Sequence, residues 1–260
     1  MKRILNISIW VLFIVGILVL LSFTQSKKRN LVCNLKVKVD NFSGNHFVTE
    51  DRVKSILKNL GFEEGMDTYS EIDTEKLERK LMAISSVESV EMYKDLNGNL
   101  EVDVKQRRPI ARVFNKNGSS LYVDDKGKTM QVSDYYTARV LVVNGHVNIR
   151  TNENYNAIAE SSELRSNSRL DEVFELTNYI SQDEFLKAQI EQIYVEKNGE
   201  IILIPKVGNQ EIIFGKVEEI EKKFKKLLLF YKEGINPNNL NLYKTINLKF
   251  DNQIVCKKNK

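Results

Sequence analysis

The sequence predicts an α+β protein in three parts: an N-terminal transmembrane helix, a small β-α-α-β-β domain, and a mostly antiparallel β domain with helices packed on it. Three observations carry this prediction. One uncharged apolar run opens the chain, two helical patterns and a hairpin pattern occupy residues 35–106, and short alternating strands separated by turn residues follow. A composition of 42% apolar and 28% charged residues can support packed cores.

The apolar run Ile4–Phe23 contains no charged residue. At about 1.5 Å per residue, a helix of this length spans a bilayer core of about 30 Å. The alternative is a cleaved signal peptide, but its apolar region is usually shorter and no typical cleavage site follows. We therefore expect a cytoplasmic tip at 1–3, an uncleaved transmembrane helix at 4–23 and a juxtamembrane linker at 24–34. Basic residues flank both ends of the span, so charge alone leaves its orientation open.

The positive charge is concentrated outside the predicted domains. The net charge is +4, yet eight basic residues flank the apolar span or lie in the basic tail at 257–260. The folded body is consequently mildly acidic, which argues against nucleic acid as a partner. The basic residues beside the span are suited to contact anionic lipid headgroups.

The first soluble domain is expected at 35–108. Thr49 and Asp73 occupy N-cap positions before two amphipathic patterns, and Gly61 stands where the first helix ends. Asn-Gly within the turn 95–99 favours a hairpin. The expected elements are a strand at 35–40, helices at 50–60 and 74–84, and strands at 87–94 and 100–105. One three-stranded sheet covered on one face by two helices is the simplest arrangement.

The second domain is expected at 109–256, because Pro109 cannot continue a central strand. Residues 145–168 are polar and aperiodic and are interpreted as a long surface excursion. The expected elements are strands at 111–114, 120–123, 139–143, 190–195, 200–204 and 210–214, and helices at 170–180 and 217–233.

The last predicted strand, 244–251, alternates strictly between apolar and polar residues. Ile246, Leu248 and Phe250 should face a core, whereas Thr245, Asn247 and Lys249 should face outward. Residues 254–256 could extend the strand after a bend. A last-added strand often lies at a sheet edge, where it can accept a partner strand. The alternatives are a central strand, or an edge that lysines protect.

The sequence contains no recognisable catalytic or ligand-binding set. His46 and His146 have no metal-ligand spacing around them, and neither a phosphate loop nor Gly-x-Ser-x-Gly is present. Asp124-Asp125 and Glu63-Glu64 are interpreted as turn and surface charge, since adjacent residues of a strand point to opposite faces. We therefore expect no catalytic residue, metal, cofactor or small-molecule substrate, and no enzyme activity.

The two cysteines, Cys33 and Cys256, lie near the two ends of the soluble part. A disulfide between them would join these ends, but spacing alone cannot show that they are close. Two free thiols therefore remain the alternative.

The β-α-α-β-β pattern resembles a POTRA domain. The resemblance is carried by the strand 35–40, the helix start Asp73-Thr74-Glu75-Lys76-Leu77-Glu78, and Ile84-x-x-Val87-x-x-Val90. Combined with one membrane span and a C-terminal β domain, it is similar to the bacterial FtsQ/DivIB cell-division family. Gln106–Val113 resembles the inter-domain junction of that family, and Tyr122-x-Asp124-x-x-Gly127 the start of its β domain.

This resemblance implies a non-catalytic divisome scaffold with an N-terminus in the cytoplasm and a periplasmic body, located in the cell inner membrane at the septum. It implies FtsB-like and FtsL-like single-span coiled-coil proteins as partners, bound by strand addition along the last strand. The implied partner-binding residues are Thr245, Ile246, Asn247, Leu248, Lys249, Phe250, Asp251, Ile254 and Val255. Residues 253–258 lack the small residues and the tryptophan of some members, so the contact could use different residues. The alternative is a POTRA-containing component of an outer-membrane assembly or secretion system, which should have several POTRA domains or a barrel.

Overall fold

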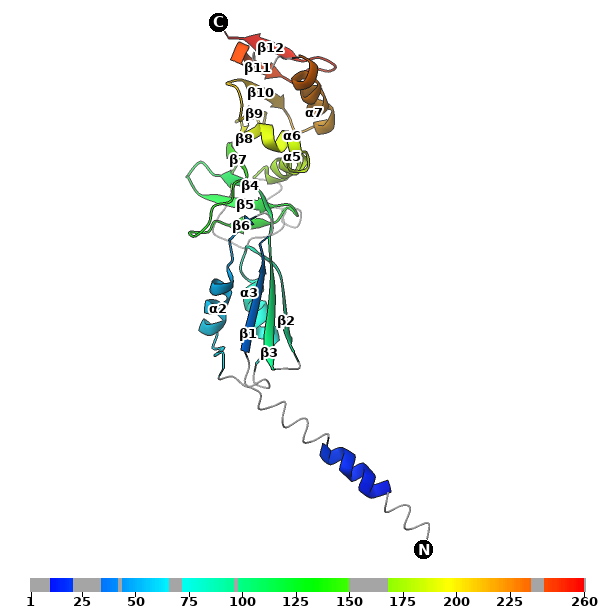
Figure 1. Cartoon of the computed structure of the whole chain (residues 1–260). Helices are drawn as coiled ribbons and strands as arrows, with labels where there is room; N and C mark the ends of the chain where they lie inside the picture. Colours follow the sequence, from blue (N-terminus) through cyan, green and yellow to red (C-terminus); the bar gives the residue numbers. More distant parts are fainter. Residues whose placement is uncertain are drawn as a thin grey trace. The chain divides into compact units, whose positions relative to one another are not determined.

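The computed structural model describes residues 10–20, 34–41, 44–65, 72–95, 98–149, 168–234 and 241–259. The chain divides into two compact units, Met1–Gln106 and Arg107–Lys260 (Figure 1). This division falls two residues before the predicted domain boundary. Each unit is described by itself below.

The predicted transmembrane span is only partly covered. Residues 10–20 form an exposed helix, whereas 4–9 and 21–23 lie outside the described residues, as do the tip 1–3 and most of the linker. Among the described residues, no helix reaches the length and apolarity needed to cross a membrane.

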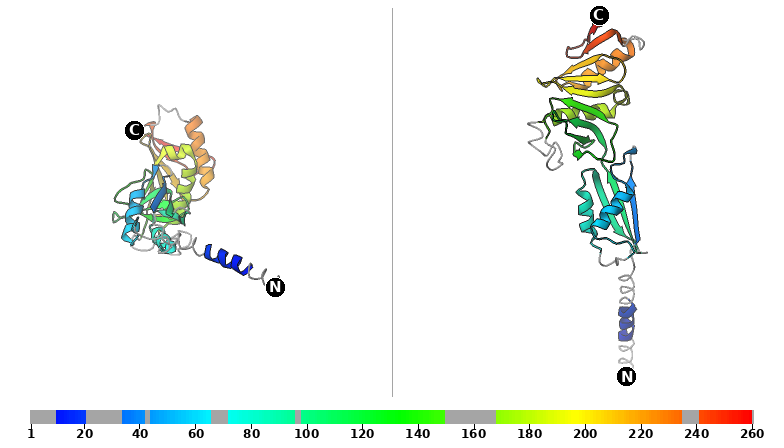
Figure 2. Two further views of the ribbon diagram at one scale, coloured as in Figure 1. Left: turned by 60° about the horizontal axis from the view of Figure 1, so that its bottom comes forward. Right: turned by 90° about the vertical axis from the view of Figure 1, so that its left-hand side faces the viewer.

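The first unit has the predicted β-α-α-β-β order. Its elements are β1 (Asn34–Asp40), α2 (Glu50–Asn59), α3 (Thr74–Met82), β2 (Val87–Lys94) and β3 (Asn99–Gln106). β3 is central, with β1 parallel on one side and β2 antiparallel on the other. The two helices cover one face of this sheet (Figure 2). The predicted small α/β core is therefore confirmed.

Local capping explains where these helices begin and end. The Thr49 hydroxyl accepts a hydrogen bond from the Arg52 N–H at 3.3 Å, and Asp73 accepts one from the Lys76 N–H at 3.0 Å. Gly61 has a φ of 94°, which suits a residue after a helix end. Both predicted N-caps are confirmed, because capping depends on residues only three positions apart.

The buried side chain of Gln106 links two segments of the first unit by hydrogen bonds. Its Oε1 accepts a hydrogen bond from the Val48 N–H at 2.8 Å, and its Nε2 donates to Asp40 O at 3.2 Å. A buried amide is stable when such partners satisfy it. The end of β3 is thereby joined to the segment between β1 and α2.

The described residues of the second unit form one nine-stranded sheet and three α-helices. Its strands are β4 (Pro109–Phe114), β5 (Ser120–Asp124), β6 (Thr129–Gln131), β7 (Leu141–Gly145), β8 (Ile190–Val195), β9 (Ile201–Pro205), β10 (Glu211–Gly215), β11 (Tyr243–Asn247) and β12 (Val255–Lys258). Its helices are α5 (Leu170–Gln182), α6 (Glu184–Gln189), α7 (Ile220–Leu229) and the π-helix η2 (Phe230–Gly234). The short elements β6 and α6 were not predicted, and α7 begins three residues later than expected.

The strand order of this sheet is β12-β11-β10-β9-β8-β7-β4-β5-β6. Five of its strand pairs are antiparallel, so the prediction of a mostly antiparallel sheet is confirmed. Three pairs are parallel: β4 with β7, β7 with β8, and β10 with β11. A parallel pair needs a long crossover connection. α7 belongs to the crossover from β10 to β11, and α5 and α6 to that from β7 to β8.

The helices α5, α6 and α7 lie on the same face of this sheet (Figures 1 and 2). Phe224 of α7 is fully buried, and its ring stacks on Tyr179 of α5 at 5.2 Å and packs against Phe214 of β10 at 5.1 Å. Aromatic pairs at these separations add to the stabilisation from burial. α7 is therefore fastened to both the sheet and α5, next to the last two strands.

Candidate functional site

The nine-stranded sheet has β6 at one edge and β12, at the end of the chain, at the other (Figure 1). β12 pairs with β11 in antiparallel register, with Cys256 opposite Ile246 and Val255 opposite Asn247. Among the described residues, no strand lies on its other side. The backbone groups of an edge strand can pair with another chain.

The hydrogen-bond alternation of β12 identifies its outward backbone groups. The Asn259 N–H donates to Leu242 O at 2.8 Å, so Asn259 faces β11. Successive residues of an antiparallel strand alternate between the two sides. Lys257 therefore faces β11 as well, whereas the N–H and C=O groups of Cys256 and Lys258 point away from the sheet.

The side chains of β12 alternate between the two sheet faces. Cys256 lies on the helix-covered face, since it stands opposite the fully buried Ile246, and it packs against the core. Burial raises the pKa of this thiol, which keeps it protonated at neutral pH. Val255 lies on the opposite face with 45% of its surface exposed. The edge thus combines two outward backbone donors with an exposed apolar side chain.

Of the alternatives left open for residues 244–251, the structure supports a strand inside the sheet and not an edge strand. β11 ends at Asn247 and lies between β10 and β12. The Leu248 N–H donates to Ile213 O at 2.9 Å, which continues the pairing with β10. The chain then reverses near Asn252, which adopts a φ of 55°, and returns as β12 instead of extending β11.

The predicted partner-binding residues fall into three groups. Thr245, Ile246 and Asn247 belong to β11, Leu248 to Asp251 form the bend, and Ile254 and Val255 lead into β12. Ile246 and Leu248 are fully buried, so their side chains support the core. The expected burial of Phe250 is wrong: its side chain is 44% exposed, because the alternation does not continue past the end of β11.

Lys249 is exposed, as expected, and its ammonium group pairs with Glu200 at the surface of the unit. Its Nζ donates to the two carboxylate oxygens of Glu200 at 2.8 and 3.1 Å. The stem of Lys249 crosses Gly215, where an added Cβ would lie 2.8 Å from Cγ and Cδ. Gly215 also has a φ of 78°. This left-handed backbone conformation favours glycine, and the absence of a side chain leaves room for the lysine stem beside the sheet.

A second lysine holds the bend from the helix side. The Nζ of Lys226, on α7, donates to Leu248 O at 3.0 Å and to Phe250 O at 2.5 Å. Hydrogen bonds from a charged donor are stronger than neutral ones. Lys226 therefore ties α7 to the segment that presents Phe250. No local pattern in the sequence indicates this contact, since its carbonyl partners lie more than 20 residues away.

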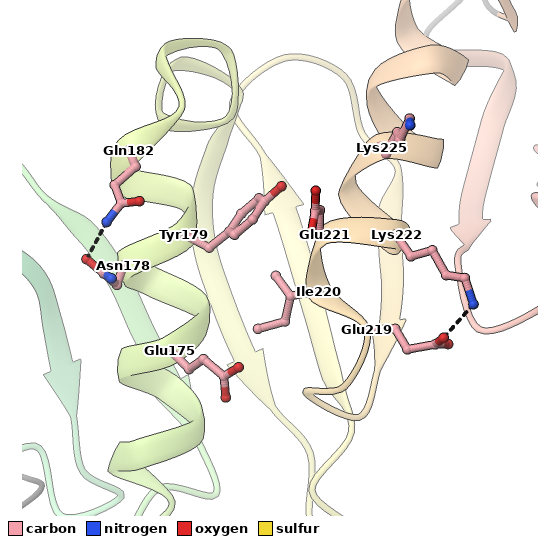
Figure 3. Close-up of a pocket in the computed structure, with 9 residues that line it drawn as sticks. All are labelled: Glu175, Asn178, Tyr179, Gln182, Glu219, Ile220, Glu221, Lys222 and Lys225. Carbon is pink, nitrogen blue, oxygen red and sulfur yellow. Dashed lines mark hydrogen bonds and ion pairs between the residues drawn. The ribbon is translucent and has the colours of Figure 1, made fainter.

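A groove of about 660 Å³ lies between α5 and α7. Its lining residues are Glu175, Asn178, Tyr179, Gln182, Glu219, Ile220, Glu221, Lys222 and Lys225 (Figure 3). Burial raises the pKa of Tyr179, and the carboxylate of Glu219 is engaged by Lys222 at 2.5 Å. None of the predicted partner-binding residues lines this groove.

The acidic pairs named in the sequence differ in their surroundings. Glu63 and Glu64 are exposed, as expected. Asp124 is not a surface charge: its side chain is 1% exposed and accepts from Arg107 Nη1 at 3.0 Å and from the Lys128 N–H at 2.6 Å. The ion pair and the turn bonds explain why a carboxylate is tolerated there. Among the described residues, no group of three His, Cys, Asp or Glu side chains could hold a metal ion.

Comparison with protein families gives two matches. Residues 108–257 match the model of the FtsQ/DivIB C-terminal related domain, and residues 31–105 match the model of a POTRA-like domain. The chain belongs to the FtsQ/DivIB family, a family of bacterial cell-division proteins. A search of curated proteins found no match.

Proposed function

We propose that this protein is a non-catalytic divisome scaffold, anchored in the cell inner membrane, which recruits or regulates septal division proteins through its extracytoplasmic units. Membership of the FtsQ/DivIB family supports the cell-division role. The uncharged run Ile4–Phe23 supports a membrane anchor. The placement of residues 1–3 in the cytoplasm rests on the family. A role in outer-membrane assembly is less well supported, because 108–257 match an FtsQ/DivIB-related domain.

The proposed partners are FtsB-like and FtsL-like single-span coiled-coil proteins, with a partner strand added to β12. The observation that carries this proposal is the open edge of β12, with outward backbone groups at Cys256 and Lys258. Val255, Phe250 and Asp251 are exposed beside it and are the predicted site residues that a partner could contact directly. Lys249 is exposed as well, whereas the buried Ile246 and Leu248 would support this surface from within the unit.

The short length of β12 limits what strand pairing alone can contribute. Two outward N–H groups are available, and a typical intramolecular hydrogen bond has a net worth of about 1 kcal/mol. Stable recruitment therefore needs further contacts, for which the exposed side chains of Phe250 and Val255 are placed.

The proposal is tested with three variants of β12 in full-length protein. Lys258→Pro removes an outward N–H, Lys258→Ala removes only the side chain, and Lys257→Pro removes an N–H that faces β11. We expect Lys258→Pro to reduce partner binding several-fold without loss of stability. Lys258→Ala should bind almost normally, and Lys257→Pro should destabilise the β11–β12 pair.

For the parent protein and the two Lys258 variants, binding is measured in cells by photocrosslinking from position 257, with mass spectrometry of the products. For Lys257→Pro, thermal unfolding is measured. A crosslink to a small single-span coiled-coil division protein, lost in Lys258→Pro and kept in Lys258→Ala, is the expected result. Equal crosslinking in both Lys258 variants would exclude strand addition at β12. A crosslink only to a wall polymerase or a barrel protein would overturn the assigned partner class.

A further inference from the structure

The three-stranded sheet of the first unit has β1 and β2 as its outer strands. On each of them, one backbone N–H that points away from β3 donates a hydrogen bond to a glutamate side chain. This differs from β12, whose pairing with β11 leaves its other side open among the described strands. The difference bears on where an extended partner segment can add to the protein.

On β2 the outward side is identified by its pairing with β3. The Asp95 N–H donates to Asn99 O at 2.9 Å, so Asp95 faces β3. The register of the two strands is unbroken from Ser89 to Lys94, and alternation therefore turns Met92 away from β3. Its N–H belongs to the free edge of the sheet.

The Met92 N–H is occupied by a side chain of α3. It donates to Glu78 Oε1 at 2.7 Å, in a partly buried position. Glu78 is half-buried on a helix that starts at the Asp73 cap, so its place beside β2 is fixed by the packing of α3. This N–H is the kind of donor that an incoming strand would need.

The β1 edge has a similar arrangement. The Leu35 N–H donates to Glu64 Oε1 at 3.0 Å. Glu64 is exposed and follows α2 by a few residues. The two glutamates come from different parts of the chain, yet each places a carboxylate oxygen on an edge donor.

A carboxylate on an edge N–H opposes strand addition in two ways. It is a stronger acceptor than the peptide carbonyl that would replace it, because its hydrogen bond is charge-assisted. It also places a negative charge where an incoming backbone would bring its own carbonyl oxygens. Inward-pointing charged residues at sheet edges are a known means of preventing edge-to-edge pairing.

We propose that Glu78, together with Glu64, closes the POTRA-like sheet to extended segments, including the same edge of a second copy of this chain. The closure itself is independent of the function proposed above. Its consequence for recruitment, that a partner strand is directed to β12, rests on that proposed function.

The test uses the full chain purified in detergent, with Glu78→Ala as the main variant. Glu78→Gln keeps an amide oxygen that can accept from Met92. Glu91→Ala removes the same charge from β2 itself and serves as the matched control. Glu64→Ala, at an exposed position with little risk to folding, tests the β1 edge separately.

Two quantities are measured for each variant: the hydrogen-exchange rate of one edge amide, and self-association by light scattering. The amide is that of Met92 for the Glu78 and Glu91 variants and that of Leu35 for Glu64→Ala. Glu78→Ala should exchange Met92 roughly tenfold faster or more, since it loses a hydrogen bond to a charged group. It should also self-associate with increasing concentration. Glu91→Ala should behave like the parent protein. Glu78→Gln, which keeps an acceptor oxygen but loses the charge, should lie between the parent and Glu78→Ala in both quantities.

An unchanged Met92 exchange rate in Glu78→Ala would overturn the assignment of Glu78 to this donor. Faster exchange in a variant that stays monomeric would overturn the closing role, because the freed edge then attracts no strand. If Glu78→Ala does not fold, faster Leu35 exchange with self-association in Glu64→Ala still supports the closing role, and its absence contradicts it. Neither quantity depends on a division partner, so these results are separable from the crosslinking outcome at β12.

Discussion

Lys226→Met is the most direct test of how the structure holds the bend between β11 and β12. Methionine keeps most of the aliphatic stem but removes the ammonium group that donates to Leu248 O and Phe250 O. The helix should remain intact, since methionine and lysine have similar helix propensities. The change therefore isolates the connection between α7 and the bend.

The expected cost follows from the two hydrogen bonds. A bond to a charged group contributes about 1.5–3 kcal/mol, but the contact with Phe250 O is exposed and the contact with Leu248 O is only partly buried. Allowing for solvent screening, we expect a total loss of about 2 kcal/mol in the free energy of unfolding of the second unit. For a unit of this size the loss lowers the melting temperature by roughly 4–8 °C.

The assay combines thermal unfolding with hydrogen exchange of the segment 243–259. The Leu248 amide, which donates to Ile213 O, reports whether the end of β11 stays paired with β10. Its exchange should accelerate in Lys226→Met, and recruitment through β12 should weaken because the bend no longer holds Phe250 in place.

Lys225→Met is the matched control, since Lys225 is exposed one residue earlier on the same helix. It removes the same charge and should change stability by no more than about 0.5 kcal/mol. Equal melting temperatures and equal Leu248 exchange in the two variants would refute the reasoning, because the bend would then be held without the ammonium group.

Three further outcomes are expected. Arg107→Ala leaves the buried Asp124 carboxylate without its ion-pair partner and should cost about 3 kcal/mol in urea unfolding; a double variant with Asp124→Asn should lose less than the sum. The hydrogen bond to Glu101 raises the pKa of Tyr93 to about 12, so its phenolate absorbance should appear well above pH 10. Any stabilisation that Tyr93→Phe removes should be present below pH 10 and lost as the pH rises towards 12. Cys256 has a thiol pKa raised by burial, so peptide mass spectrometry should show slower alkylation than of an exposed thiol at pH 8; equal rates would contradict it.

The first unit was predictable because its signals are local. Thr49 and Asp73 cap helices through bonds to residues three positions ahead, and the hairpin strands are joined by a short turn. Cys33, Arg3 and residues 150–167 of the predicted surface excursion 145–168 lie outside the described residues. At the described start of that excursion the prediction is wrong, because Val147 and Ile149 are buried in the core. Among the described residues Cys256 has no disulfide partner, and its pairing with Cys33 stays untested.

The second unit was less predictable because its sheet is assembled from distant segments. β10 and β11 pair in parallel, with Ile212 beside Ile246, across the crossover that contains α7. Alternation indicates that a strand is half-buried, but it does not say which strands become its neighbours. The burial of Asp124 was missed for the same reason, since its partner Arg107 precedes β4.

The sequence by itself determined the class of the protein: an apolar span, a β-α-α-β-β module, a β domain, and residues that resemble the FtsQ/DivIB family. Only the tertiary structure decided which backbone groups are available to a partner. It placed β11 inside the sheet and β12 at its edge, and it brought Glu78 to the Met92 N–H. The physical reason is that an edge is defined by what lies beside a strand, and those neighbours come from elsewhere in the chain.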